Sequence, residues 1–300
     1  MADEPTPIRF DAWLPPEMAD KAETIGIKKA GLDGMTMFAL SVLAGAFIAM
    51  GAIFSTTTVA GMAGEAPYGM IRLAAGLTFT LGLILVVVAG AELFTGNNLI
   101  VMAWADGRVN TMALIRNWTI VYIGNFVGSI ATAALMFFSR QYEFGNGAIG
   151  ITAVNIANTK SGLDFVQALI LGIFCNALVC LAVWLCFSAR TTTDKILSII
   201  PPIAAFVAAG FEHSVANMYF IPVGLFISSD QAWMASLGER APNVANLTWY
   251  NFLVGNLVPV TIGNIIGGAV MVGLVYWFIY LRPKRMPKVD TKVTPIGAGK

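Results

Sequence analysis

Two short polar stretches inside long apolar segments contain the residues best suited to chemistry. They run Ala89-Gly90-Ala91-Glu92-Leu93-Phe94-Thr95-Gly96-Asn97-Asn98 and Ala209-Gly210-Phe211-Glu212-His213-Ser214-Val215-Ala216-Asn217. The second contains the only histidine of the chain, His213. Histidine can donate a hydrogen bond or a proton near physiological pH, and ionisable residues within membrane segments are costly and usually functional. We therefore expect His213 to act on a passing weak-acid anion rather than to be a neutral structural residue.

The two polar stretches also match each other. Glu92 corresponds to Glu212, and Asn97 to Asn217, at equal spacing. The segments that follow match as well, because Asn117-x7-Asn125 has its counterpart in Asn256-x7-Asn264. The carboxylates could line a cation path, but we expect them to hold loop amides or neighbouring polar groups, since exposed carboxylates repel anions. We expect Asn97, Asn125, Asn217 and Asn264 to form hydrogen bonds between helices.

The composition indicates a membrane protein. Of 300 residues, 57% are hydrophobic and only 12% charged, whereas a soluble domain carries about a quarter charged residues. The net charge of +1 points to no nucleic-acid partner. Cys175, Cys180 and Cys186 share one apolar segment without metal or disulfide spacing, so we interpret them as small apolar residues and expect no cofactor and no metal. Because the first 34 residues are polar and have no short apolar core, we expect no cleavable signal peptide there.

The apolar segments that must position these residues predict an all-α integral membrane protein with six transmembrane helices. The expected spans are Met35–Phe54, Met70–Ala105, Met112–Phe138, Phe165–Phe187, Ile196–Ile227 and Leu247–Leu281. The six spans place 14 of the 18 lysines and arginines on one side of the membrane. The other side has only Arg72, Arg140, Lys160 and Arg240. Positive residues concentrate on the cytoplasmic side. We therefore expect a multi-pass protein of the bacterial inner membrane with cytoplasmic N- and C-termini.

Two of the expected spans are too long for one helix. Met70–Ala105 would run about 54 Å as an α-helix, against a hydrocarbon layer of about 30 Å, and Ile196–Ile227 is also too long. We therefore predict that helices 2 and 5 are broken at the midplane, with Thr95 and Ser214 as N-caps of the second pieces. Helix N-termini favour anions. Because three spans per repeat is an odd number, the second copy must cross the membrane in the opposite sense to the first. Such inverted repeats are typical of transport proteins.

This interpretation divides the chain into three parts. Residues 1–34 form a cytoplasmic segment with an amphipathic helix, Pro16–Lys29, which has Met18, Ala22 and Ile25 on one face and lies at the membrane surface. Residues 35–281 form the channel domain, an inverted 3+3 repeat of about 35–138 and 165–281. Residues 282–300 form a basic cytoplasmic tail.

Three motifs resemble signatures of the formate/nitrite transporter family, most closely those of its bacterial formate channels. They are Glu92-Leu-Phe-Thr-Gly-Asn97, Gly210-Phe-Glu-His-Ser-Val-Ala-Asn-Met218 and Asn256-Leu-Val-Pro-Val-Thr-Ile-Gly-Asn-Ile-Ile-Gly-Gly268. The resemblance covers roughly residues 10–282. It implies an aquaporin-like fold, assembled in the lipid bilayer as a homopentamer with one pore in each protomer.

The resemblance also implies roles for individual residues. Thr95 and His213 would bind the anion at the pore centre, with Asn176 nearby in the pore wall. The resemblance further implies a cytoplasmic constriction of Phe79, Leu83 and Phe206, a periplasmic constriction of Phe94 and Val179, and a vestibule lysine, Lys160. Glu92, Asn97, Glu212 and Asn217 would support the breaks.

The predicted function is a passive channel or proton-coupled transporter of small monovalent anions, with formate as the leading substrate. Nitrite or hydrosulfide is the alternative within the same family. An intramembrane hydrolase using Ser214 with His213 is geometrically poor, because adjacent helical residues do not face each other. A cation channel lined by Glu92 and Glu212 is a third possibility.

Overall fold

The computed structural model describes residues 11–285, which are helical with no strand. The expected tail, 282–300, falls mostly outside these residues, as do the first ten residues of the expected N-terminal segment. The first half of the chain contains α1 (Pro15–Ala30), α2 (Gly34–Val59), α3 (Tyr68–Ile84), η1 (Leu85–Gly90), α4 (Phe94–Asn97), η2 (Asn98–Ile100), α5 (Val101–Ala105), α6 (Thr111–Phe138) and η3 (Gln141–Glu143). The second half contains α7 (Ala148–Ser161), α8 (Phe165–Ser188), α9 (Thr192–Ala209), α10 (Ser214–Ser229), α11 (Gln231–Ser236), η4 (Gly238–Arg240), η5 (Asn251–Leu257), α12 (Val258–Ile265), η6 (Ile266–Leu274), η7 (Trp277–Leu281) and α13 (Arg282–Arg285).

Six helices within the described residues are long and apolar enough to cross a membrane, as predicted. They are Gly34–Val59, Tyr68–Gly90, Thr111–Phe138, Phe165–Ser188, Thr192–Ala209 and Asn251–Lys284. The overlong predicted segments, Met70–Ala105 and Ile196–Ile227, each overlap one of these six helices, Tyr68–Gly90 and Thr192–Ala209 respectively. In both, non-helical residues follow, and then a second helical part begins, at Phe94 and Ser214 respectively.

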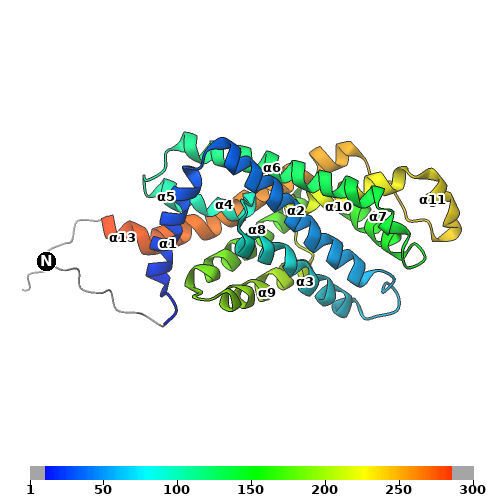
Figure 1. The fold of residues 1–300 in the computed structure, drawn as a ribbon, viewed down its shortest axis with the longest axis horizontal. Coiled ribbons are helices and arrows are strands. Elements are labelled where there is room, and N and C mark those ends of the chain that lie inside the picture. Colours follow the sequence, from blue (N-terminus) through cyan, green and yellow to red (C-terminus); the bar gives the residue numbers. More distant parts are fainter. Residues whose placement is uncertain (1–10, 286–300) are drawn as a thin grey trace, which may run out of the picture.

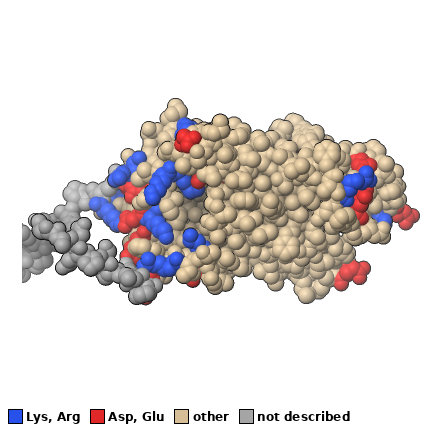
Figure 2. All heavy atoms as spheres, in the orientation of Figure 1, with Lys and Arg blue, Asp and Glu red and all other residues tan. Residues whose placement is uncertain are grey.

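The helices form an elongated bundle with two distinct ends (Figure 1). Helices α1, α5 and α13 lie at one end, which we call the α1 end, and α7 and α11 lie at the other, which we call the α7 end. Figure 2 shows charged side chains gathered at both ends and a broad band without them in between. This distribution fits a band in contact with lipid, because charged groups are costly in hydrocarbon.

Close helix packing fixes the interior of the bundle. Helix α2 packs on α3 and α6, helix α8 packs on α9 and α12, and α3 contacts α9. A Cβ atom added at Gly128 would overlap the Val42 carbonyl oxygen, and one at Gly267 would overlap that of Ile173. Small residues allow membrane helices to approach this closely. The α2–α6 and α8–α12 contacts therefore depend on the same kind of glycine at matching places.

Helix α1 matches the predicted amphipathic helix, with bounds one residue wider at each end. It buries Met18 and Ala22, and it packs on η2, α5 and α8. Trp13 precedes it and is held at the C-terminus of α8, where the Ser188 hydroxyl donates to the Trp13 carbonyl oxygen at 2.9 Å and the Arg190 guanidinium lies 4.4 Å from the indole. The apolar face of α1 thus contacts the protein itself.

Candidate functional site

Two short non-helical loops interrupt the bundle, which we call loop A (Ala91–Leu93) and loop B (Gly210–His213). Loop A follows Gly90, whose φ is +85°, and loop B begins at Gly210, whose φ is +79°. Residues with side chains rarely adopt this left-handed conformation, so glycine allows the chain to leave the helix at both places. Ala91, Leu93 and His213 have extended backbone.

A buried asparagine of α6 holds loop A. The Asn125 Oδ1 atom accepts the backbone N–H of Phe94 at 2.9 Å, and its Nδ2 donates to the carbonyl oxygens of Ser41 at 2.7 Å and Glu92 at 2.9 Å. One side chain therefore satisfies backbone groups on both sides of the helix start, in a region where unpaired polar groups are costly.

Loop B is held in the same way by an asparagine of α12. The Asn264 Oδ1 atom accepts the backbone N–H of Ser214 at 2.9 Å, and its Nδ2 donates to the carbonyl oxygens of Gly172 at 2.8 Å and Glu212 at 2.9 Å. The corresponding asparagines, predicted as partners between helices, thus make corresponding bonds.

The prediction that Thr95 and Ser214 are N-caps is wrong. The N-cap residues are Leu93, which has no side-chain cap, and His213, whose Nδ1 accepts the Ala216 N–H at 3.0 Å. The physical reason is that asparagines of distant helices bind the first free N–H groups, so a local hydroxyl is not required there.

The buried carboxylate of loop A is neutralised by a lysine of α1. The Lys29 Nζ atom lies 2.8 Å from Glu92 Oε1 and 2.9 Å from Asn97 Oδ1. Asn97 Nδ2 donates to Glu92 Oε2 at 2.7 Å and to Asn117 Oδ1 at 3.0 Å. Asn117 in turn donates to the Lys29 carbonyl oxygen at 3.1 Å, which closes the network.

The carboxylate of loop B has the same arrangement with α7. Lys160 Nζ lies 2.7 Å from Glu212 Oε1, and Asn217 Nδ2 donates to Glu212 Oε2 at 2.6 Å. Asn217 also donates to Asn256 Oδ1 at 2.7 Å, and Asn256 donates to the Lys160 carbonyl oxygen at 2.9 Å. Both carboxylates are therefore compensated, and buried ion pairs need such additional bonds.

Thr95 and His213 meet although 118 positions separate them in the sequence. The Thr95 Oγ1 and His213 Nε2 atoms lie 2.9 Å apart, with 0% and 3% of these residues exposed. Asn176 Nδ2 donates to the Thr95 carbonyl oxygen at 3.3 Å, as does the Cys180 thiol. Within residues 11–285, no three His, Cys, Asp or Glu side chains are placed to hold a metal ion. The structure thus brings together the three residues predicted for the pore centre.

Aromatic rings connect this centre to the α7 end. The His213 ring stacks on Phe206 at 5.9 Å, and Phe206 contacts Phe79 at 5.7 Å. Phe79 stacks on Phe220 at 6.2 Å, and the Lys160 ammonium lies 5.6 Å from the Phe220 ring. Phe220 was not predicted from the sequence, because one phenylalanine in an apolar helix gives no signal that distinguishes a pore wall from packing.

The profile of the formate/nitrite transporter family matches residues 16–278 of the chain, which is most of it. The protein belongs to this family. It is similar to the formate channel FocA of Escherichia coli K12, with 46% identity over 284 residues that cover 94% of this chain and 98% of the relative. FocA of Haemophilus influenzae is 43% identical, over 91% of this chain and 97% of the relative. The predicted family resemblance is confirmed.

Solved structures of the formate/nitrite transporter family have the same fold. One, described as a pentameric formate channel with formate bound, superposes with a TM-score of 0.77 at 45% identity, covering 83% of this chain and 98% of that one. Another, described as an FNT family ion channel, gives a TM-score of 0.72 at 28% identity, over 87% and 98% of the two chains.

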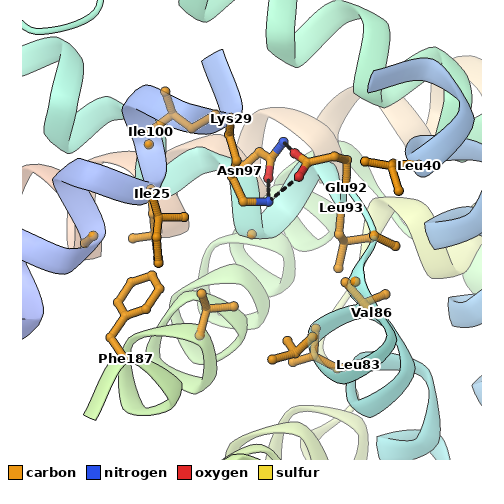
Figure 3. A pocket seen from close by; sticks show the side chains of 18 residues that line it. Ile25, Lys29, Leu40, Leu83, Val86, Glu92, Leu93, Asn97, Ile100 and Phe187 are labelled. Atoms are coloured by element: carbon orange, nitrogen blue, oxygen red, sulfur yellow. Dashed lines mark hydrogen bonds and ion pairs between the residues drawn. The ribbon is translucent and has the colours of Figure 1, made fainter. Parts of the chain in front are cut away.

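In this family member, a cavity of about 390 Å³ lies between α1 and loop A (Figure 3). Lys29, Glu92 and Asn97 form its polar side, while Leu83 and Phe187 belong to its apolar wall. In the sequence, Lys29 counts only among the positive residues that set the orientation. The match between the two polar stretches was a partial signal, because it indicates that whatever compensates Glu212 should have a counterpart at Glu92, but it does not say which lysine.

The predicted grouping of the constriction residues needs correction. Phe79 and Phe206 face the α7 end through Phe220, whereas Leu83, one turn after Phe79 on α3, lines the cavity beside α1. These three residues were expected to form one ring on the side of the N-terminus. The difference arises from the direction in which α3 runs. This helix starts at the α7 end and runs toward α1, so its earlier residues lie nearer the α7 end (Figure 1).

Phe94 also lies on the other side from the one predicted. It contacts Trp118 at 6.2 Å and Tyr122 at 4.9 Å. Trp118 Nε1 donates to the carbonyl oxygen of Asn97, the residue whose side chain binds Lys29 of α1. Phe94 therefore neighbours the α1 end, which was predicted to be cytoplasmic, rather than the periplasmic side.

Proposed function

We propose that the protein conducts small monovalent anions, above all formate, along a path through the Thr95–His213 pair. The observation that carries this proposal is a buried hydroxyl–imidazole pair at 2.9 Å, located where two interrupted helices resume. An anion crossing low dielectric must exchange water for other hydrogen-bond donors. The pair supplies such a donor without adding a full charge that would trap the ion.

Apolar side chains on either side of the pair keep out water and competing ions. Toward the α7 end the path passes Phe206 and Phe79, and toward the α1 end it passes Phe94 and Leu83, with Val179 in the wall. Such narrow apolar rings make a bare ion costly and can close by dewetting. The aromatic contacts of Phe79 and Phe206 support this arrangement.

We infer that the two halves of the chain, about 35–138 and 165–281, form an inverted repeat whose broken helices resume near the membrane midplane. The corresponding bonds of Asn125 and Asn264, and of the two Lys–Glu pairs, support this inference. The pairs lie on α1 and α7, at opposite ends of the bundle, as an inverted arrangement requires (Figure 1). Lys160, the expected vestibule lysine, and Lys29 would act at the two vestibules by neutralising Glu212 and Glu92, so that these carboxylates do not repel anions.

Formate is favoured over nitrite and hydrosulfide as the substrate. The similar curated proteins from Escherichia coli and Haemophilus influenzae are named formate channels, and one similar structure is described as a pentameric formate channel with formate bound. By extension we propose a homopentamer with one pore per protomer. The protein would reside in a bacterial inner membrane, with the α1 end cytoplasmic.

The geometry gives less support to an intramembrane hydrolase or a cation channel. A hydrolase would need His213 as the base for Ser214, but the ring nitrogens of His213 are engaged by Thr95 and by the Ala216 N–H. A cation channel would need exposed carboxylates, but Glu92 and Glu212 are buried and paired with lysines.

Flux measurements on purified protein in liposomes test the proposal. We expect formate to cross down its gradient and nitrite to cross more slowly, with no passage of sodium or potassium. Peptidase activity lost in Ser214→Ala would establish the hydrolase instead, and sodium flux lost in Glu212→Gln would establish the cation channel. Vesicles without protein, and vesicles with heat-denatured protein, are the controls.

A further inference from the structure

We propose that His213 is a fixed, neutral hydrogen-bond donor with its single ring proton on Nε2, because its Nδ1 atom is committed to capping helix α10. This inference rests on the proposed function, since it specifies what the central histidine offers to the anion. His213 would therefore both cap helix α10 and line the pore.

The position of the proton follows from the cap. His213 Nδ1 lies 3.0 Å from the backbone nitrogen of Ala216, and His213 has the extended backbone of an N-cap residue. A backbone N–H can only donate, so Nδ1 must present a lone pair. In neutral imidazole one nitrogen is an acceptor and the other carries the proton. The proton is therefore on Nε2.

The same reasoning orients the contact with Thr95. Because Nε2 carries the proton, it donates to Thr95 Oγ1 over the 2.9 Å that separates them. The threonine oxygen is then an acceptor toward His213, and its own O–H is left to point at a passing anion. Helix α10, His213 and Thr95 thus form a chain of donors that ends on the substrate.

A second proton on the ring would be strongly opposed. It would have to bind Nδ1, which would break the cap and place a cation at the positive end of α10. The charged and titratable groups of neighbouring elements offer no compensation: Lys160 on α7 and Arg72 on α3 are cations, and Cys180 on α8 bonds the Thr95 carbonyl. Glu212 in loop B already accepts bonds from Lys160 and Asn217 at its two oxygens.

The consequence concerns where a transported proton originates. If neutral His213 gave its Nε2 proton to formate, it would become an imidazolate, which is far too basic to form here. Any proton that travels with formate therefore comes from solution with the substrate, and His213 acts on the passing species only through the hydrogen bond that orients the Thr95 hydroxyl.

Because His213 is the only histidine of the chain, 15N-histidine labelling reports this ring alone. We would purify the protein with a tag that contains no histidine and record nitrogen NMR spectra in liposomes from about pH 5 to 8, the range in which an ordinary histidine titrates. We expect one protonated nitrogen, Nε2, and one unprotonated nitrogen, Nδ1, at every pH. A proton on Nδ1, or two protonated nitrogens at the acidic end, would overturn the proposal.

The variant Thr95→Val tests whether the helix cap or Thr95 places the ring proton of His213 on Nε2. It removes the acceptor of the Nε2 proton and leaves the Ala216 N–H in place. We expect the Nε2 resonance to shift while Nδ1 stays unprotonated. Movement of the proton to Nδ1 in this variant would show that Thr95, not the cap, selects the tautomer. Both readouts are independent of transport, so they remain decisive even if the protein conducts another ion.

Discussion

Glu92 and Glu212 show how single charges are accommodated in an apolar interior. Each carboxylate has one lysine and one asparagine on separate oxygens, and each lysine lies on a helix outside the six long spans. Removing one partner of a buried ion pair leaves an uncompensated charge, which costs about 3–5 kcal/mol. The helices α1 and α7 therefore contribute to the loops through Lys29 and Lys160, and their positions are coupled to the shape of the path.

The Thr95 hydroxyl should determine flux at the pore centre. We predict that Thr95→Val, which keeps the side-chain shape, lowers formate flux in liposomes roughly 10- to 100-fold, because loss of a hydrogen bond to a charged group costs about 1.5–3 kcal/mol. Thr95→Ser keeps the hydroxyl and should retain most of the flux. Equal flux in the two variants would remove the hydroxyl from the permeation path.

At the scale of elements, glycines decide how closely helices approach. The α2–α6 contact has Gly128 directly against the backbone of Val42, and α8–α12 has Gly267 against that of Ile173. Backbone atoms cannot move aside as flexible side chains do. These contacts also align Asn125 and Asn264 with the loops that they hold.

The α2–α6 contact yields a prediction with a matched control. Gly128→Ala should lower stability by about 1–3 kcal/mol or more, the usual cost of overpacking a core. Gly69→Ala, on α3 with no atom within 4 Å of the added Cβ, should cost nothing. Thermal unfolding of the detergent-solubilised protein measures both. A Gly128→Ala variant as stable as Gly69→Ala would contradict the tight contact.

Hydrogen bonds among Tyr142, Asp230 and Trp233, which we call the tie, link η3 to α11 at the α7 end. The Tyr142 hydroxyl donates to Asp230 Oδ2 at 2.7 Å, and Asp230 Oδ1 accepts the Trp233 N–H at 3.0 Å. Burial, together with the bond to Asp230, raises the pKa of Tyr142 to about 12. The bond from the Trp233 N–H, followed by that from Tyr142, lowers the pKa of Asp230 below its usual range.

These shifts predict how the stability of the tie depends on pH. The Tyr142 contribution is complete below the ordinary tyrosine pKa of about 10 and disappears as the pH rises through about 12. The Asp230 contribution is complete above the ordinary aspartate pKa of about 4 and disappears as the pH falls through its lowered value. Tyr142→Phe should therefore lower the Tm near neutral pH, with a smaller difference at both extremes. A difference independent of pH would contradict the tie.

For the whole molecule, the distribution of charge sets the orientation in the membrane. Charged side chains lie at two ends separated by an apolar band, and α1 and α13 share one end (Figures 1 and 2). Cytoplasmic loops of membrane proteins carry the excess of lysine and arginine. The end that contains α1 and α13 is therefore the expected cytoplasmic end.

Cysteine labelling tests this orientation. The native cysteines, Cys175, Cys180 and Cys186, are buried, so the unmodified protein is the control and should react little. We predict that an impermeant maleimide added to intact spheroplasts labels Glu239→Cys, at the α7 end. Lys28→Cys, on α1, should react only after permeabilisation. The reverse pattern would invert the assigned topology.

The sequence alone determined the six apolar segments, the two places where helices must end early, and the family. These features are local, because apolar length, glycine and polar side chains act on the chain where they stand. Only the tertiary structure decided that distant asparagines hold the loops, that Lys29 meets Glu92, and that Leu83 and Phe79 face opposite ends. Such contacts depend on the direction and packing of helices far apart in the chain, which no local pattern of residues specifies.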